Sequence, residues 1–98
     1  MSAYILFDNL TVTSPEALET YKSKVGEVVE KHQGKYVVLG GKTRVVEGSI
    51  TPRYLVMIEF PNFEMAEKWY DSEEYEELKA LRMSATTSTG LIIEGLPL

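Results

Sequence analysis

The sequence predicts an α+β protein of the ferredoxin-like class, in which helices cover one face of a four-stranded antiparallel sheet. The apolar patterns along the 98 residues follow the order strand-helix-strand-strand-helix-strand, which is the split βαββαβ arrangement. Two helix-start signals, Ser14-Pro15 and Asn62, directly follow the first and third strand-like runs. Because such connections are right-handed, we expect both helices on the same face of the sheet.

In the first half of the chain, residues 3–12 show the two-residue periodicity of a strand. A helix is expected over residues 15–33, where one face is apolar, and Gly34 suits the position just after its end. Residues 35–47 predict the second strand, in which Gly40-Gly41 indicates a bulge or a bend.

In the second half, residues 54–60 are apolar on both alternating sides, which is typical of a strand covered on both faces. A helix is expected over residues 63–83, and a second capping signal at Asp71-Ser72 predicts a break within it. Residues 84–90 are small and polar and indicate a linker, and residues 90–95 supply the fourth strand.

The predicted sheet has a second face that the helices do not cover. Leu55 and Met57 of the third strand point to this side and are apolar, and the first and fourth strands are apolar on both sides. An uncovered face of this kind would exceed the apolar patches that monomers usually expose. We therefore expect a homodimer that forms through this face of the sheet.

The composition argues against several classes of protein. The net charge of −5 at pH 7 argues against nucleic acid and anionic membranes as partners. No cysteine is present, no apolar run is long enough to span a membrane, and the start lacks the basic region of a signal peptide. We expect a single domain, 1–98, in the cytoplasm. Neither a glycine-rich phosphate loop nor a metal-ligand spacing occurs, so no cofactor and no metal are expected.

Three charged side chains are candidates for chemistry. His32 is the one histidine and the best general base, and its alternative role is a partly buried histidine favoured by the helix dipole. Arg82 ends the apolar stripe of the last helix and is suited to clamp an anionic substrate. Glu59 stands alone on an apolar strand face, and we expect it within reach of Arg82. If that pair is buried, losing Glu59 should cost about 3 to 5 kcal/mol.

Aromatic residues at helical spacing have two interpretations. Trp69 or Tyr36 is expected as a wall of the cleft, and Tyr21, Tyr70 and Tyr75 are further candidates to line it. The alternative, which is the more common one for aromatics at this spacing, is that they form the core.

The residues also carry a resemblance to a known family. The string Trp-Tyr-x-Ser-x-x-Tyr is its most specific part, and the matching positions cover nearly the whole chain. They are Pro15, Tyr21, His32 to Tyr36, Gly40-Gly41, Glu47-Gly48, Glu59-Phe60-Pro61, Ala66, Trp69-Tyr70-Asp71-Ser72, Tyr75, Leu78, Leu81 and Arg82. The chain resembles the family described as domain of unknown function 1330. This resemblance implies the dimeric α+β barrel form of the ferredoxin-like fold. The wider superfamily includes cofactor-free monooxygenases, small-molecule isomerases or cyclases, and haem proteins, so the fold alone does not decide the reaction. By that analogy a haem bound through His32 is an alternative, which no other feature of the sequence supports.

Two classes of function stay open from the sequence. The first is a cofactor-free enzyme that acts on a small carbonyl or phenolic compound by proton transfer or oxygenation. Its substrate would lie in a cleft between helices and sheet, with His32 as the base and Arg82 as the anion clamp. The second is a non-catalytic dimer that binds a small molecule in the same cleft, or a protein through its acidic helix. An ordered ligand that touches both His32 and Arg82 would favour the enzyme.

Overall fold

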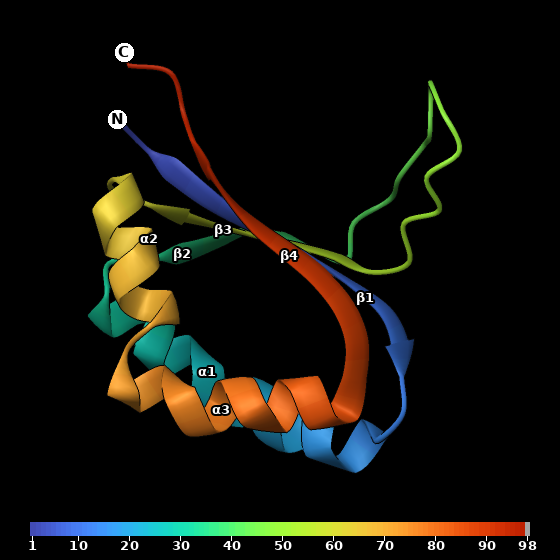
Figure 1. Cartoon of the computed structure of the whole chain (residues 1–98), viewed down its shortest axis with the longest axis horizontal. Coiled ribbons are helices and arrows are strands. Elements are labelled where there is room, and N and C mark those ends of the chain that lie inside the picture. Colours follow the sequence, from blue (N-terminus) through green and yellow to red (C-terminus); the bar gives the residue numbers. More distant parts are fainter. Residues whose placement is uncertain (98) are drawn as a thin grey trace.

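Helices cover one face of a four-stranded sheet in the computed structural model, which describes residues 1–97 (Figure 1). The strand order is β2-β3-β1-β4, and every neighbouring pair is antiparallel. The elements in chain order are β1 (Ala3–Val12), α1 (Pro15–Lys31), β2 (Lys35–Leu39), β3 (Leu55–Phe60), α2 (Phe63–Tyr70), α3 (Glu73–Ala85) and β4 (Thr86–Glu94). With α2 and α3 as two parts of one broken helix, the predicted ferredoxin-like βαββαβ order is confirmed.

Side-chain caps start each helix where the sequence predicts a start. The hydroxyl of Ser14 accepts a hydrogen bond from the Ala17 amide at 3.4 Å, and Pro15 occupies the first helical position. The Asn62 side chain caps α2. The Ser72 hydroxyl accepts from the amide of Tyr75 at 3.2 Å and starts α3. The break predicted at Asp71-Ser72 is therefore confirmed.

The second strand is shorter than predicted, because β2 ends at Leu39 rather than at residue 47. Gly40 turns the chain out of the sheet with a φ of +66°, and a side chain there would collide with the Tyr54 ring. Residues 40–53, here called the arm, then extend away from the helices and return to β3 (Figure 1). The irregularity in the pairing of β2 lies between Tyr36 and Val38, upstream of the predicted bulge.

The fourth strand is longer than predicted, because the expected linker 84–90 is largely part of β4. The threonines of this segment are β-branched and fit a strand, and Thr86 already has the extended φ of −142°. The segment pairs with β1, with Asn9 opposite Ser88 and Val12 opposite Thr86. The turn into β4 is therefore immediate, and α3 continues to Ala85.

The end of α1 also differs from the prediction. The left-handed residue that follows the helix is Gln33, with a φ of +63°, and not Gly34. Gly34 is needed for a different reason, since an added Cβ atom would lie 2.6 Å from the ring of Phe60.

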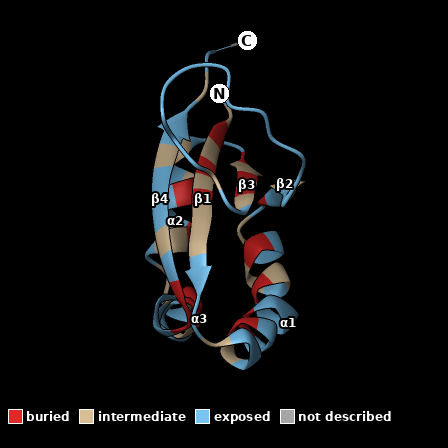
Figure 2. Cartoon of the chain, turned by 90° about the vertical axis from the view of Figure 1, so that its right-hand side faces the viewer, coloured by how far each residue is buried: buried red, intermediate tan, exposed pale blue. Residues whose placement is uncertain are grey.

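The core lies on the inner face of the sheet, which we define as the face that the helices cover. Ile5, Ile58 and Phe60 point to this side and are fully buried, as are Trp69 and Tyr75 from the helices. The rings of Trp69 and Tyr75 lie face to face at a tilt, with centroids 4.1 Å apart. Figure 2 shows the buried residues between the sheet and the helices.

The outer face of the sheet, on the opposite side, is apolar and has no helix over it. Its side chains alternate with the buried ones and meet across the strands, as Leu6 does with Met57 and with Leu91. The apolar members of the outer face are Tyr4, Leu6, Leu55, Met57, Leu91 and Ile93. This is the surface on which the sequence predicts a second copy of the chain. Among residues 1–97, no helix has both the length and the apolar character to cross a lipid bilayer.

Candidate functional site

A cleft of about 290 Å³ opens between α1 and the inner face of the sheet. Its side walls are aliphatic and aromatic, with Tyr21 and Val25 from α1 facing Val56 and Ile58 from β3. The volume suits a compact ligand, because pockets for drug-sized molecules begin at roughly 300 Å³. The predicted cleft between helices and sheet is therefore present.

The inner end and the mouth of the cleft differ in exposure. The inner end is formed by Arg82 of α3 and Phe7 of β1, both of which are buried. The mouth is formed by Lys22, Tyr54 and Leu39, and Leu39 is 62% exposed. A ligand would enter beside the base of the arm and reach Arg82 last.

Arg82 is held by three neighbours at the inner end of the cleft. Its Nε donates a hydrogen bond to the hydroxyl of Tyr75 at 3.3 Å, and its Nη1 donates to the Oγ of Ser88 at 2.7 Å. The guanidinium carbon lies 4.4 Å from the centre of the Phe7 ring, in a cation–π contact. These contacts fix the plane of the guanidinium.

The charge of Arg82 has no acidic partner among residues 1–97. Only 4% of the residue is exposed, so water screens this charge poorly. A buried charge is costly unless it is paired, and two of the five N–H donors of an arginine are used here. The remaining donors and the unpaired charge are groups with which an anion could form hydrogen bonds and an ion pair.

Tyrosine hydroxyls extend the polar end of the cleft. The hydroxyls of Tyr21 and Tyr75 lie 2.9 Å apart and share a hydrogen bond. Burial, with a smaller effect from Tyr75, raises the pKa of Tyr21 far above its ordinary value. Burial also raises the pKa of Tyr36 to about 12, again with a smaller effect from Tyr75. Both phenols are therefore neutral hydrogen-bonding groups at physiological pH and not bases.

Two polar residues of the site, Asn9 and Ser88, are absent from the predicted set. They are direct partners in the pairing of β1 with β4, and Ser88 contacts Arg82. The amide oxygen of Asn9 is buried and has no donor within residues 1–97, and the residue lines the cleft. These residues come close to Arg82 only through the register in which β1 pairs with β4. Ser88 also falls in residues 84–90, for which the sequence predicts a linker.

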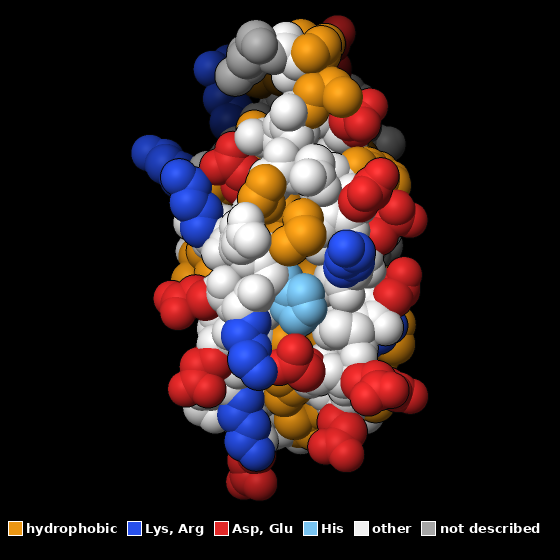
Figure 3. All heavy atoms as spheres, turned by 90° about the vertical axis from the view of Figure 1, so that its left-hand side faces the viewer, with side chains coloured by type: hydrophobic (Ala, Val, Ile, Leu, Met, Phe, Trp, Pro, Cys, Tyr) orange, Lys and Arg blue, Asp and Glu red, His pale blue; other side chains and the backbone are white. Residues whose placement is uncertain are grey.

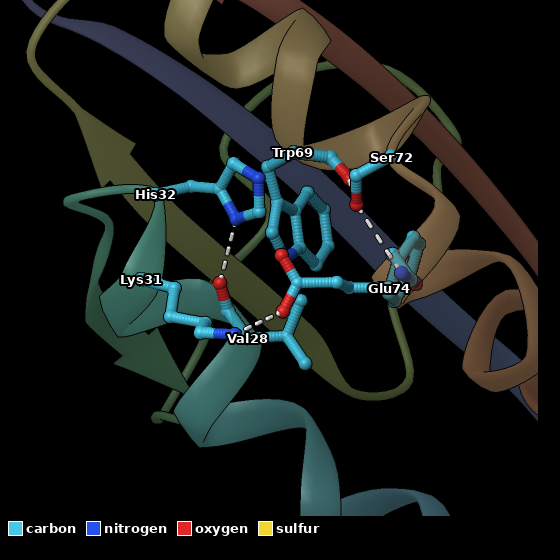
Figure 4. A network of polar contacts seen from close by, with 7 residues as sticks. Val28, Lys31, His32, Trp69, Ser72 and Glu74 are labelled. Carbon is cyan, nitrogen blue, oxygen red and sulfur yellow. Dashed lines mark hydrogen bonds and ion pairs between the residues drawn. The ribbon is translucent and has the colours of Figure 1, made fainter.

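His32 lies outside the cleft, at the end of α1. Its Nδ1 is 2.9 Å from the carbonyl oxygen of Val28, so Nδ1 carries a proton and donates it (Figure 4). Lys31 and Glu74 lie beside it and form an ion pair of 2.6 Å between α1 and α3. Their hydrogen bond raises the pKa of Lys31 and lowers that of Glu74. The structure does not bring His32 and Arg82 to one cleft.

The surroundings of His32 are a mixed surface of charged and hydrophobic side chains, outside the cleft lining. Figure 3 shows this side of the molecule, with the histidine at the surface and acidic side chains along the face. The histidine is half-buried in this setting. Its geometry agrees with the alternative role from the sequence, that of a residue at a helix end.

Glu59 does not contact Arg82, and the expectation of that pair is wrong. Glu59 lies on the outer face, where its Oε2 accepts a hydrogen bond from Tyr4 at 3.5 Å. Its Oε1 is 3.7 Å from the ammonium of Lys35. The strand alternation that buries Ile58 on the inner face sends Glu59 to the other side of the sheet.

The two aromatic candidates for the wall have different places. Tyr36 lines the cleft from β2, as expected. Trp69 is fully buried behind Tyr75 and belongs to the core. A second cavity of about 320 Å³ lies toward β4, and it shares Arg82 and Phe7 with the cleft.

Comparison with solved structures shows the same fold in several proteins. A protein of unknown function from Rhodopseudomonas palustris is 19% identical, with a TM-score of 0.74 over 99% of this chain and 84% of that one. A dimeric ferredoxin-like protein of unknown function from Jannaschia sp. CCS1 is 8% identical, with a TM-score of 0.74 over 97% and 100%. SnoaB, a cofactor-independent oxygenase from Streptomyces nogalater, is 8% identical, with a TM-score of 0.57 over 99% and 93%. These likenesses show the fold.

Sequence comparison gives the family. A search of the curated proteins found no match. The sequence model of a domain of unknown function, DUF1330, matches residues 2–96. The chain belongs to the DUF1330 family.

Proposed function

We propose that the protein binds a small carbonyl or phenolic compound in the cleft as its anion and acts on it as a cofactor-free enzyme. The observation that carries this proposal is Arg82, a buried cation at the end of an apolar cleft without an acidic partner among residues 1–97. An enolate or a phenolate oxygen would supply the missing negative charge. The aromatic and aliphatic walls would hold the rest of the compound.

The chemistry follows from the position of that charge. A fixed cation in a site that excludes water favours the anionic form of its ligand, so it lowers the ligand's pKa and stabilises charge that develops on oxygen. No carboxylate or histidine among residues 1–97 lines the cleft, so a phenol, or the enol tautomer of a 1,3-dicarbonyl compound, loses its O–H proton to water on binding. The resulting anion is electron-rich at carbon, which is the state needed for proton transfer at that carbon or for reaction with dioxygen. The cofactor-independent oxygenase with the same fold supports this class of reaction.

A specific observation favours a second candidate function, a dimer that binds a small molecule without transforming it. Within the described part of the chain, residues 1–97, each side chain that lines the cleft is apolar, a tyrosine, an amide or a basic group. None of these has an ordinary pKa near neutrality, which an efficient general base needs. The two candidates share the ligand and differ in whether it is turned over.

The test measures ligand binding to matched variants. Small phenols, 1,3-dicarbonyl compounds and aromatic carboxylates are screened by thermal shift, and the hits are measured by calorimetry. We expect a hit to bind the wild type and His32→Ala equally. It should bind Arg82→Lys more weakly and should not bind Arg82→Gln. Lys24→Gln, which removes a positive charge from an exposed position of α1 that does not line the cleft, is the control for net charge.

Equal binding to the wild type and a folded Arg82→Gln variant would contradict the proposal. Loss of binding in His32→Ala alone would restore the assignment of the base that the sequence predicts. For any compound that binds, product formation and oxygen consumption then separate the enzyme from the binding protein.

We also infer that the working form is a homodimer joined through the outer face. The apolar residues of that face are the support for this inference, and the relative from Jannaschia is itself described as dimeric. Light scattering behind a sizing column should give about twice the chain mass of 11.1 kDa. A mass of one chain at micromolar concentration would contradict it.

A further inference from the structure

We propose that the ligand of the cleft is a dianion, with one anionic group at Arg82 and a second at Lys22, at opposite ends of a flat apolar body. This inference rests on the proposed function, in which an anion binds at Arg82. It narrows the ligand to small aromatic or unsaturated compounds that carry two acidic groups.

The charge of the lining is the first observation. The chain has 15 acidic and 10 basic residues, so a random patch of its surface would be acidic on average. The cleft has the opposite balance, because Lys22 and Arg82 line it and no aspartate or glutamate of the described residues 1–97 does. The lining is therefore selective for anions and carries two positive charges.

The two cations differ in burial, because only 4% of Arg82 is exposed whereas the side chain of Lys22 is 49% exposed. Arg82 lies at the inner end with the buried Phe7 ring. The ammonium of Lys22 lies over the ring of Tyr54 at the mouth, 5.7 Å from its centre. Between the ends the lining is mainly apolar and aromatic. A ligand with a single anionic group can contact only one of these cations. A second anionic group on the ligand would pair with the other cation.

Lys22 is free to bind a ligand. Its contact with Glu19 is 4.0 Å long, and the two side chains are 49% and 78% exposed. An exposed pair of this kind contributes little and is easily exchanged for a better partner. The carboxylate of a ligand that is held in place at its other end would be such a partner.

The arm adds positive charge near the mouth. It leaves β2 after Leu39 and returns at Tyr54, and both of these residues form the mouth. The arm carries Lys42, Arg44 and Arg53 against a single acidic residue. A local positive field on an otherwise acidic protein would draw dianions to the cleft.

The test compares one and two charges on the same ring. Benzoate, 4-methylbenzoate and benzene-1,4-dicarboxylate are titrated by calorimetry into the wild type, Lys22→Gln and Lys24→Gln. Lys24 is an exposed lysine of the same helix that does not line the cleft, so its variant has the same net charge as Lys22→Gln. We expect the dicarboxylate to bind the wild type about fivefold more tightly than either monoanion. This ratio should fall to about one in Lys22→Gln and persist in Lys24→Gln.

The outcomes separate this inference from the proposed function. Binding of benzoate that is as tight as that of the dicarboxylate would overturn the dianion and leave the anion site at Arg82. A preference for the dicarboxylate that persists unchanged in Lys22→Gln would also overturn it. If none of the three compounds binds to the wild type and the carbonyl and phenolic compounds do, the carboxylate dianion is wrong and the proposed function stands. If nothing binds in either screen, both are wrong.

Discussion

The two faces of the sheet are incomplete in different ways. On the inner face the apolar core is closed, and what lacks a partner is a charge, that of Arg82. On the outer face the charge of Glu59 has partners, and what lacks cover is the apolar surface around Met57. An unpaired cation in a cleft is suited to bind a small anion, whereas an uncovered apolar face is suited to bind another protein surface. This difference is the basis of both proposals, ligand binding at the inner face and association through the outer face.

Strand β3 separates the two faces residue by residue. Val56, Ile58 and Phe60 are buried on the inner face, and Leu55 and Met57 alternate with them on the outer face. Residues of similar polarity that alternate along one strand thus lie in different environments. Substitutions on the two sides of β3 can therefore test the comparison between the faces directly.

The largest expected effect is the difference between Phe60→Glu and Met57→Glu. Phe60 is fully buried on the inner face and does not line the cleft. Phe60→Glu therefore places an unpaired carboxylate in the core, at a cost of about 5 kcal/mol or more, which is comparable with the whole stability of a small domain. We expect this variant not to fold. Met57→Glu places the carboxylate on the outer face and should give a folded monomer, because the charge opposes association and not folding.

Circular dichroism and light scattering check this pair of variants. Met57→Leu is the control, and it should remain a dimer. A folded dimer of Met57→Glu would show that the outer face is not the interface. A folded Phe60→Glu would show that the core behind the cleft is less tightly packed than described.

The second expected effect concerns the buried phenols of the inner face. The pKa of Tyr36 is raised from 10.0 to about 12, and that of Tyr21 is raised further. Folding therefore favours the protonated phenols, and this contribution to stability is fully present below pH 10. It is lost progressively as the pH rises from about 10 through 12, because the unfolded chain ionises first. The free energy of unfolding should fall over this range.

Denaturant titrations at several alkaline pH values measure that fall, and the near-ultraviolet absorbance of phenolates follows ionisation. Tyr36→Phe should show a smaller loss of stability between pH 10 and 12, since one of the two groups is removed. The same loss in both proteins would mean that Tyr36 titrates as it does in an unfolded chain.

The fold was predictable because its signals are local. Capping residues and apolar periodicity give the start of each helix, the break at Asp71-Ser72 and the order of elements. The errors lie where tertiary contacts decide. Residues 40–47 have strand-like composition, but Gly40 turns them away from the sheet. The segment that begins at Thr86 looks like a linker and becomes a strand by pairing with β1.

The candidate site was predictable only in part. The end of an apolar helical stripe placed Arg82 correctly at the cleft, and Tyr36 also lines it. The alternation that assigns Leu55 and Met57 to the uncovered face also assigns Glu59 to it, so the expected contact between Glu59 and Arg82 conflicted with the predicted faces of this strand. Asn9 and Ser88 come together through the register of β1 and β4, which no local pattern reveals. The predicted role of His32 required it to lie in the same cleft as Arg82, and the sequence does not give the distance between these two residues in the folded chain. The structure places His32 outside the cleft lining.

The smallest expected effect is that of Glu59→Gln, and it sharpens the contrast between the faces. A carboxylate paired with a buried Arg82 would have made this change cost about 3 to 5 kcal/mol. The structure gives a side chain that is 27% exposed, with a 3.7 Å contact to a largely exposed Lys35 and a long hydrogen bond from Tyr4. Pairs of this kind contribute at most about 1 kcal/mol. Chemical denaturation of the wild type, Glu59→Gln and Lys35→Gln should give two small and similar losses. Repeating the measurement at several protein concentrations shows whether association buries Glu59, since the loss would then grow with concentration. A loss of 3 kcal/mol or more at every concentration would mean that the charge on the outer face is as critical as the one on the inner face, and the comparison would fail.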